Sequence, residues 1–242
     1  MRLTLIHARA ITIELLRYPA FSVPTLAFPA VFFLLFVASR GDRNPTLLMA
    51  SFAGFAFLAV AFFQFGVGIA AERETPWERF LRTLPVQAGV RFAARLLSGT
   101  LFGLASAGVV ALTAIATTDA HLPAARWGGL VLALILGAAP FALLGIALGY
   151  WTSPRGALPI ANILYLVLAF AGGLWTTPAR LPDTVASVSQ LVPTRQFGEV
   201  LWGAARGRWW QPWDWLLLFA WAALFGLLAA WGYGRDEGRR YR

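Results

Sequence analysis

The residues best able to do chemistry in this sequence are three glutamates in a short charged segment between two long apolar runs. Glu72, Glu74 and Glu78 are close enough along the chain to be considered for general acid–base catalysis. However, Arg73 and Arg79 alternate with them. Neutralisation of charge and helix capping explain this cluster better than catalysis does. The sequence therefore predicts no catalytic residues here.

The same segment predicts a short amphipathic helix. Thr75 can accept a hydrogen bond from the backbone N–H of Glu78, whose side chain can bond back to Thr75, and this forms a capping box. Pro76 suits the first helical position, and Pro85 ends the helix. One face carries an apolar stripe while two arginines point elsewhere: Trp77, Phe80, Leu81 and Leu84, with Arg79 and Arg82. Such a helix indicates a surface for another protein.

The composition indicates a membrane protein. Hydrophobic residues make up 59% of the 242 residues, charged residues only 13%, and the mean hydropathy is +0.66. The net charge of +9 does not predict nucleic-acid binding, because the arginines are dispersed among apolar runs rather than gathered on a polar domain. All 20 basic residues are arginines, which favours a bacterial source, and cysteine is absent.

Six apolar runs are each long enough to cross a hydrocarbon core of about 30 Å. They cover residues 20–39, 47–71, 96–118, 128–151, 157–176 and 215–233, and no charged residue or histidine falls inside them. Backbone groups in lipid must bond within their own segment, so the expected fold class is all-α, a polytopic membrane protein with six transmembrane helices. No linker or repeat divides the sequence, so residues 1–242 are expected to form one membrane domain.

Arginine counts predict the orientation of the chain. Thirteen arginines lie on the side of both termini and seven on the other side. By the positive-inside rule both termini are cytoplasmic, in the bacterial inner membrane, and the charged helix faces the cytoplasm too. His7 and His121 then lie on opposite sides of the membrane and cannot share a metal ion. No metal site or cofactor is expected.

Two segments outside the spans also predict helices. Residues 1–18 read as an amphipathic helix along the inner interface. Residues 177–213 predict two short outer helices, with Leu181 and Pro182 near the start of the first and Pro193 as its stop. These outer helices either dip into the membrane or lie at its surface. GxxxG spacings in the third and fourth spans favour close helix contacts within one chain.

The sequence lacks a driving force of its own. No GxxxxGK[ST] phosphate loop is present, and no ionisable residue lies within a span to carry protons. If the chain transports a solute, we expect the energy to arrive through the cytoplasmic charged helix.

These features together resemble the membrane subunit of an ATP-binding-cassette exporter, the type 2 permease family. The resemblance covers essentially the whole chain and rests on three motifs in order. They are Arg17-Tyr18-Pro19 before the first span, Glu72 to Leu81 after the second, and Leu181-Pro182 with Pro193 between the fifth and sixth. The family often has a glycine where this chain has Thr75-Pro76.

The resemblance implies roles for individual residues. The segment after the second span would be the coupling helix that seats on a cytoplasmic ATPase: Glu72, Arg73, Glu74, Thr75, Pro76, Trp77, Glu78, Arg79, Phe80, Leu81 and Arg82. The second and fifth spans would line the substrate path, with candidates Phe57, Phe62, Gln64, Phe65, Asn162 and Tyr165. We expect Gln64 and Asn162 to be buried inside the bundle, because an amide there needs a partner. Residues from Leu181 to Arg206 would form the external helices.

The function predicted from the sequence is therefore the permease subunit of an ATP-driven exporter of an apolar or amphiphilic substrate. Its expected partners are a cytoplasmic ABC ATPase, a second copy or a related permease, and membrane lipids, but no nucleic acid. Two alternatives stay open: a membrane-embedded enzyme acting on lipid or isoprenoid substrates, and a six-span assembly that does not transport.

Overall fold

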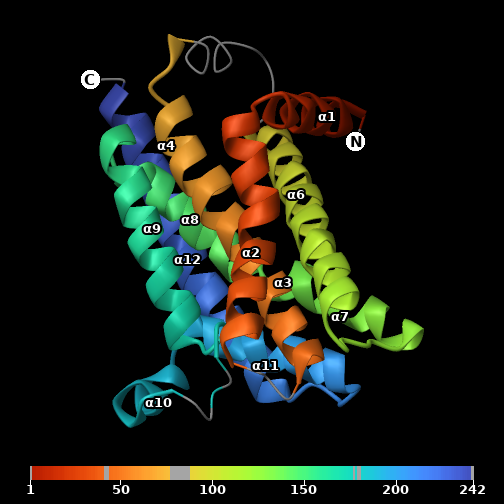
Figure 1. Cartoon of the computed structure of the whole chain (residues 1–242). Helices are drawn as coiled ribbons and strands as arrows, with labels where there is room; N and C mark the ends of the chain where they lie inside the picture. The colour runs from red at the N-terminus through yellow and green to blue at the C-terminus, as the bar shows by residue number, and fades with distance from the viewer. Residues whose placement is uncertain (1, 41–43, 77–87, 177, 179–180, 241–242) are drawn as a thin grey trace.

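The computed structural model describes residues 2–40, 44–76, 88–176, 178 and 181–240, and Figure 1 shows their path. The described part of the chain contains helices and no strand, and six helical segments are long and apolar enough to cross a membrane. These are Pro19–Phe36, Pro45–Glu72, Gly89–Thr117, Ala124–Trp151, Pro154–Ala171 and Pro212–Asp236. The predicted all-α fold with six spans is confirmed.

Two of the six spans are composite. The second span consists of α3 (Pro45–Val60), the π-helix η1 (Ala61–Val67) and α4 (Gly68–Glu72), and the fourth consists of α7 (Ala124–Gly137) and α8 (Ala139–Trp151). The other helices are α1 Arg2–Leu16, α2 Pro19–Arg40, α6 Ala88–Thr117, α9 Pro154–Ala171, α10 Asp183–Ser189, α11 Pro193–Arg206 and α12 Pro212–Arg240.

The second span forms the centre of the bundle. Buried residues make up 89% of an 18-residue apolar stretch of it, against 22% of such a stretch in the fifth and in the sixth span. The side chains of α3 itself are apolar on every side of the helix, a pattern typical of a helix enclosed by others. The start of α3 is fixed because the Asn44 side chain accepts the Leu47 N–H at 3.4 Å and Pro45 occupies the first turn. A displacement of this span would disturb α6, α8, α9 and α11, which all contact it.

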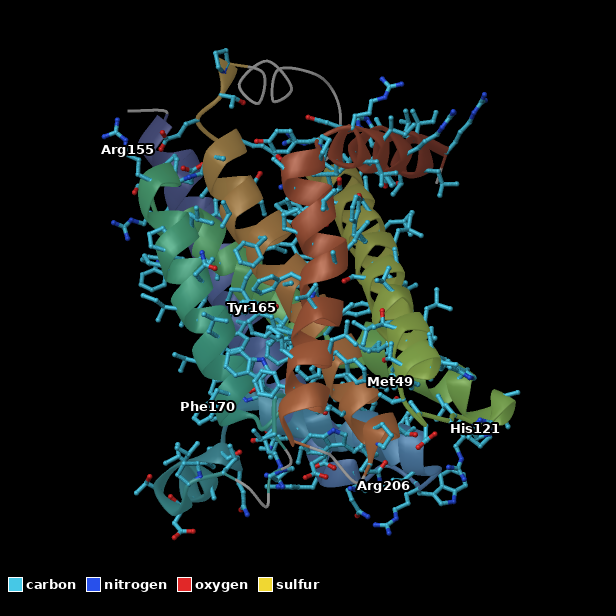
Figure 2. All side chains as sticks on the ribbon, in the orientation of Figure 1. Met49, His121, Arg155, Tyr165, Phe170 and Arg206 are labelled. Atoms are coloured by element: carbon cyan, nitrogen blue, oxygen red, sulfur yellow. The ribbon has the colours of Figure 1, made fainter. Side chains whose placement is uncertain are left out.

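The two ends of the bundle carry different elements (Figure 1). Both termini, α1 and the end of α4 lie at one end, which we call the terminal end, and α10 and α11 lie at the other, the distal end. Figure 2 shows Arg155 at the terminal end, Tyr165 midway, and His121 and Arg206 at the distal end. The helix predicted for residues 1–18 is present as α1, packed on α2 and α6. Its place at a membrane interface stays a prediction.

The helices do not end where the apolar runs end. α6 begins at Ala88 and so includes Arg91 and Arg95, although the apolar run begins at residue 96. Long arginine side chains can carry their charge from a helix end to water, so hydropathy alone makes such helices too short. The fifth span instead stops early, at Ala171 rather than residue 176, because the chain turns at Gly173, whose φ of +74° favours glycine.

Candidate functional site

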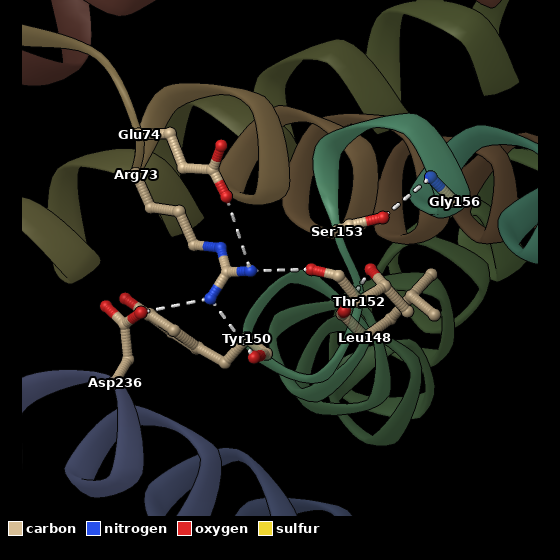
Figure 3. Close-up of polar contacts among 8 residues, drawn as sticks. All are labelled: Arg73, Glu74, Leu148, Tyr150, Thr152, Ser153, Gly156 and Asp236. Atoms are coloured by element: carbon tan, nitrogen blue, oxygen red, sulfur yellow. Dashed lines mark hydrogen bonds and ion pairs between the residues drawn. The ribbon is translucent and has the colours of Figure 1, made fainter. Parts of the chain in front are cut away.

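Arg73, at the end of the second span, is the centre of a polar cluster that joins three helices (Figure 3). Its Nη1 donates to the Asp236 carboxylate at 3.0 Å and to the Tyr150 carbonyl at 3.3 Å. Its Nη2 donates to the Thr152 carbonyl at 2.7 Å. The side chains of Arg73 and Asp236 are only 15% and 10% exposed. This group of four residues, the Arg73 cluster, ties α4 to α12 and to the turn between α8 and α9.

The local sequence explains why two carbonyls are available to Arg73. The last carbonyls of a helix have no partner within it, and they favour a cation nearby. At the end of α8 the Tyr150 carbonyl lacks even the donor that a longer helix would give it, because Pro154, four residues on, has no N–H. Thr152 is extended, with φ −110° and ψ 158°, and Ser153 then caps α9 by accepting the Gly156 N–H at 3.2 Å.

A second ion pair joins the same segment to α6. The carboxylate of Glu72 accepts from the guanidinium of Arg95. The Thr75 hydroxyl donates to the Glu72 carbonyl at 2.7 Å, and Glu74 is more than half exposed, 4.0 Å from Arg73. The first residues of the predicted coupling segment are therefore anchored on α6, α8 and α12 together.

The rest of the predicted coupling segment is only partly described. Pro76 is helical, as the capping box predicts. The capping hydrogen bond itself stays a prediction, because Glu78 lies outside the described residues. Five other predicted coupling residues also lie outside the described part of the chain: Trp77, Arg79, Phe80, Leu81 and Arg82.

The candidate path residues of the second span are all buried, but they face different helices. Phe57 and Phe65 pack against α6, where a methyl group added at Gly103 or Gly99 would lie 2.9 or 2.5 Å from their rings. Phe62 instead faces α9, with its ring centroid 6.4 Å from that of Tyr165. Tyr165 also stacks on Phe55, at 4.4 Å and 14° between the ring planes. Within one chain these rings form packed contacts between helices.

The structure contradicts the expected burial of Asn162. This residue lies on the exposed face of α9, and its amide donates to the Leu158 carbonyl of its own helix at 3.1 Å. The prediction that it is buried inside the bundle of its own chain is wrong. α9 alternates between a buried face with Ala161 and Tyr165 and an exposed face with Asn162, and hydropathy cannot distinguish the two in an apolar run.

Two of the candidate path residues carry buried polar atoms without a hydrogen bond. They are the hydroxyl of Tyr165 and the Oε1 of Gln64, which have no partner among the described residues. The Gln64 amide does donate, to Ser98 Oγ at 3.4 Å, and Ser98 also accepts from Thr12 of α1 at 3.0 Å. Polar atoms left unsatisfied in a packed core are costly, so they mark places where the packing serves something besides stability.

Gln64 lies in the π-helix η1, which α8 approaches very closely. A methyl group added at Gly145 would lie 2.1 Å from the Ala61 carbonyl, and one at Gly149 would lie 2.7 Å from Ile69. The GxxxG pair of the fourth span therefore serves contact within the chain, as predicted. The π-helix was not predicted from the sequence. Short π-helical stretches are often found at functional sites.

α11, at the distal end, is largely buried against other helices of the bundle. Phe197 and Leu201 of α11 are fully buried, and they fit where glycines leave room. A methyl group added at Gly54 of α3 would lie 2.5 Å from Leu201, and one at Gly137 would lie 2.6 Å from Phe197. Gly137 is also the last residue of α7, where the fourth span breaks. Whether α11 dips into the membrane or lies at its surface stays a prediction.

The prolines of the outer segment have partly different places from those predicted. Pro182 is the N-cap residue of α10, close to the predicted start, and Leu181 before it is buried. Pro193 was predicted to stop the first outer helix, but α10 already ends at Ser189 and Pro193 is the first residue of α11. Proline is favoured at a first helical position as well as after a helix, and this ambiguity caused the error.

The contact between α11 and α3 predicts that one small substitution lowers the stability of the protein. The indole N–H of Trp202 donates to Ser51 Oγ of α3 at 2.7 Å, and both residues are buried. Ser51→Ala leaves this N–H without its acceptor, so we expect the free energy of unfolding to fall by about 2 kcal/mol. Denaturant-induced unfolding of the purified protein in detergent micelles measures this change in free energy. The matched control is Ser187→Ala on α10, whose exposed hydroxyl bonds only to Thr184 nearby. Equal stability of the two variants would contradict the inferred role of the bond.

The sequence of this chain matches a known family and a known protein over most of its length. The family model described as "ABC-2 family transporter protein" matches residues 39–231. The chain is also similar to a protein of Bacillus subtilis (strain 168) described as "Putative transport permease YvfS". The two are 27% identical over 233 residues, which cover 93% of this chain and 94% of the relative.

Proposed function

Because this chain belongs to the ABC-2 family of membrane transporters, we propose that it is the permease subunit of an ATP-driven exporter. Its family and its six candidate spans make it a multi-pass transport permease, and the proposal assigns no catalytic activity to the chain itself. In the proposal a separate cytoplasmic ATPase supplies the energy, since the sequence has no P-loop and no lysine to complete one. The chain lies in the bacterial inner membrane with both termini in the cytoplasm, and the exported substrate is apolar or amphiphilic.

The Arg73 cluster is the observation that best supports this function. The segment proposed to seat on the ATPase, Glu72 to Leu84, begins where Arg73 and Glu72 connect α4 to three other helices. A push on this segment therefore acts on α6, α8 and α12 at once, and through α4 on the second span. Transmission of this kind requires contacts that move as a unit, and a buried, multiply bonded guanidinium is suited to that.

Transport also requires a helix packing with two states, which ATP binding biases. In the proposal the second span is the moving element, because it contacts most of the bundle and contains a π-helix. The unsatisfied polar atoms of Gln64 in η1, whose amide bonds to α6, and of Tyr165 in α9, whose ring faces Phe62 of η1, support this choice. They would gain partners in the second state, from substrate or from a rearranged neighbour.

The exposed face of α9 supports a second permease copy, or a related permease, as partner. This face carries Arg155 at the terminal end of α9 and is otherwise apolar except for the amide of Asn162, and its large residues are Leu158, Ile160, Ile163, Val167 and Phe170. A polar side chain that faces lipid is unfavourable, whereas across a helix interface it can bond. Asn162 therefore stays a path candidate in the proposed pair, at the contact between two chains.

A charge-neutral double substitution tests the docking of the ATPase. Glu78→Gln/Arg79→Gln removes one charge of each sign, and glutamine still serves in a capping box, so the helix should survive. We expect the affinity for the co-expressed ATPase to fall about 10-fold, which corresponds to about 1.4 kcal/mol. Co-purification with the tagged permease, followed by titration of the ATPase, measures it.

The control for that experiment is Asp183→Asn, which removes an exposed carboxylate from the first turn of α10 at the distal end. It should leave ATPase binding unchanged. If the double variant bound the ATPase as well as the native chain, the assignment of the docking helix would be wrong. A greater loss with Asp183→Asn would instead contradict the proposed orientation.

A further inference from the structure

A cationic groove of about 460 Å³ opens at the distal end of the bundle. It is lined by Asn44, Thr46, Leu47, His121, Arg126, Ala205, Arg206 and Arg208. Figure 2 shows His121 and Arg206 near each other at this end. The groove lies far from the Arg73 cluster, and the proposed function makes no use of it.

Three chain segments build this groove, and hydrogen bonds between side chains and backbone groups hold them together. The Thr46 hydroxyl, at the start of α3, donates to the His121 carbonyl at 3.2 Å and accepts the His121 N–H at 3.0 Å. This fixes the loop between α6 and α7 against α3. Arg126 Nη1 donates to the Ala205 carbonyl at 3.1 Å, which fixes α7 against the end of α11.

The end of α11 presents two arginines to the groove because of a glycine. Gly207 has a φ of +68°, in the left-handed region, and the Arg208 N–H returns to the Gly203 carbonyl at 2.9 Å. Arg126 lies directly over Gly207, where a methyl group would be 2.7 Å from its Nε. The backbone turn and the absence of a side chain at Gly207 thus allow Arg126, Arg206 and Arg208 to gather.

Within the described part of the chain, no acidic side chain neutralises these three guanidinium groups. Among the described residues no carboxylate lies within ion-pair distance of Arg126, Arg206 or Arg208, whereas Arg73, Arg95 and Arg195 each have at least one. Three like charges around one groove repel each other, and a bound anion would remove that cost. Of the three, only Arg126 forms a side-chain hydrogen bond within the described part of the chain, to the Ala205 carbonyl of α11.

The donor set matches a phosphate group. Guanidinium groups bind phosphate through paired N–H donors, and the Asn44 amide and the exposed His121 ring add donors at the rim. Two exposed tryptophans that follow Arg208 closely in the sequence indicate the depth of lipid headgroups. Trp209, directly after Arg208, is 96% exposed, and Trp213 at the start of α12 is 63% exposed. Tryptophans with this exposure are typical of a membrane–water interface.

We propose that the groove binds the phosphate group of an anionic phospholipid in the leaflet at the distal end of the permease. The guanidinium groups of Arg206 and Arg208 contact the phosphate, and Arg126 holds the α11 end in place beside it. A soluble phosphate ester offers the same chemistry, so the test separates the two sources.

Titration of the purified full-length protein in neutral detergent with phosphatidylglycerol tests the proposal. Thermal unfolding and the number of retained lipids, counted by native mass spectrometry, are the two readouts. We expect phosphatidylglycerol to bind and stabilise, phosphatidylcholine to do so much less, and Arg206→Gln/Arg208→Gln to weaken the phosphatidylglycerol effect at least about 10-fold. Salt should weaken it as well, since the groove is open to solvent.

Arg155→Gln is the matched control, an exposed arginine at the terminal end. It should keep the native response to phosphatidylglycerol. If it lost as much as the Arg206→Gln/Arg208→Gln variant, lipid binding would be a general effect of positive charge, and the proposal would fail. It would also fail if glycerol phosphate alone gave the full stabilisation, or if the double variant titrated like the native protein.

Discussion

Replacing Arg73 with glutamine is expected to lower the free energy of unfolding of the permease by about 3 kcal/mol and to abolish most transport. The substitution removes the guanidinium from the buried Asp236 carboxylate at 3.0 Å, and it removes the donors of the Tyr150 and Thr152 carbonyls. Breaking a buried pair from one side is costly because the other charge stays in place. Denaturant unfolding of the purified chain gives the stability. Uptake into inverted vesicles gives the transport rate, with ATP hydrolysis continuing when the ATPase is bound.

A double-mutant cycle separates the role of the ion pair from that of the two carbonyls. Asp236→Asn in the Arg73→Gln background removes the remaining charge, so part of the lost stability should return. Transport should stay low in the double variant, because the hydrogen bonds from Arg73 to the Tyr150 and Thr152 carbonyls are still missing. Native stability and native transport in Arg73→Gln would show that the cluster neither holds the helices nor couples them.

Much of the fold could be predicted because lipid leaves a chain few choices. Six apolar runs of sufficient length predict six helices, and the structure has them. The start of α3 could be predicted from Asn44 and Pro45 by the same physics that caps soluble helices. Local signals of this kind act within a few residues, so the sequence contains them in full.

The partners of the coupling segment could not be predicted, since they come from distant parts of the chain. Arg73 was identified from its place after the second span, but Asp236 is 163 residues away and Thr152 is 79 away. The only local hint was Pro154, which leaves the Tyr150 carbonyl without a helical donor. The break between α7 and α8 was hidden for the same reason: Gly137 makes room for Phe197, and that contact is tertiary.

The two ends of the bundle differ in how their arginines are used, and this difference separates two kinds of site. At the terminal end Arg73 and Arg95 are paired with Asp236 and Glu72. Paired charges hold helices together and pass on a displacement. At the distal end the arginines of the groove face solvent without a described carboxylate, and groups in that state are suited to an external anion. Counting arginines in the sequence gives only their number on each side of the membrane. It cannot distinguish an arginine paired with a carboxylate from one that is open to an external anion.

Replacing Gly145 with alanine is expected to lower the free energy of unfolding by about 3 kcal/mol, although only one methyl group is added. That methyl group would lie 2.1 Å from the Ala61 carbonyl oxygen and 3.0 Å from its carbon. Both atoms belong to the backbone of η1, which cannot rotate away as a side chain can. α8 and the second span would have to separate along a contact that also includes Gly149 and Gly66.

Gly108→Ala is the control for this prediction, because Gly108 lies in the middle of α6 and an added methyl group meets nothing within 4 Å. Alanine is the better helix former, so the control should be as stable as the native chain or slightly more stable. Unfolding of both variants in the same detergent makes the comparison direct. If Gly145→Ala unfolded together with Gly108→Ala, α8 and η1 would not be in contact at this distance. The second span would then be free to move at this position without displacing α8.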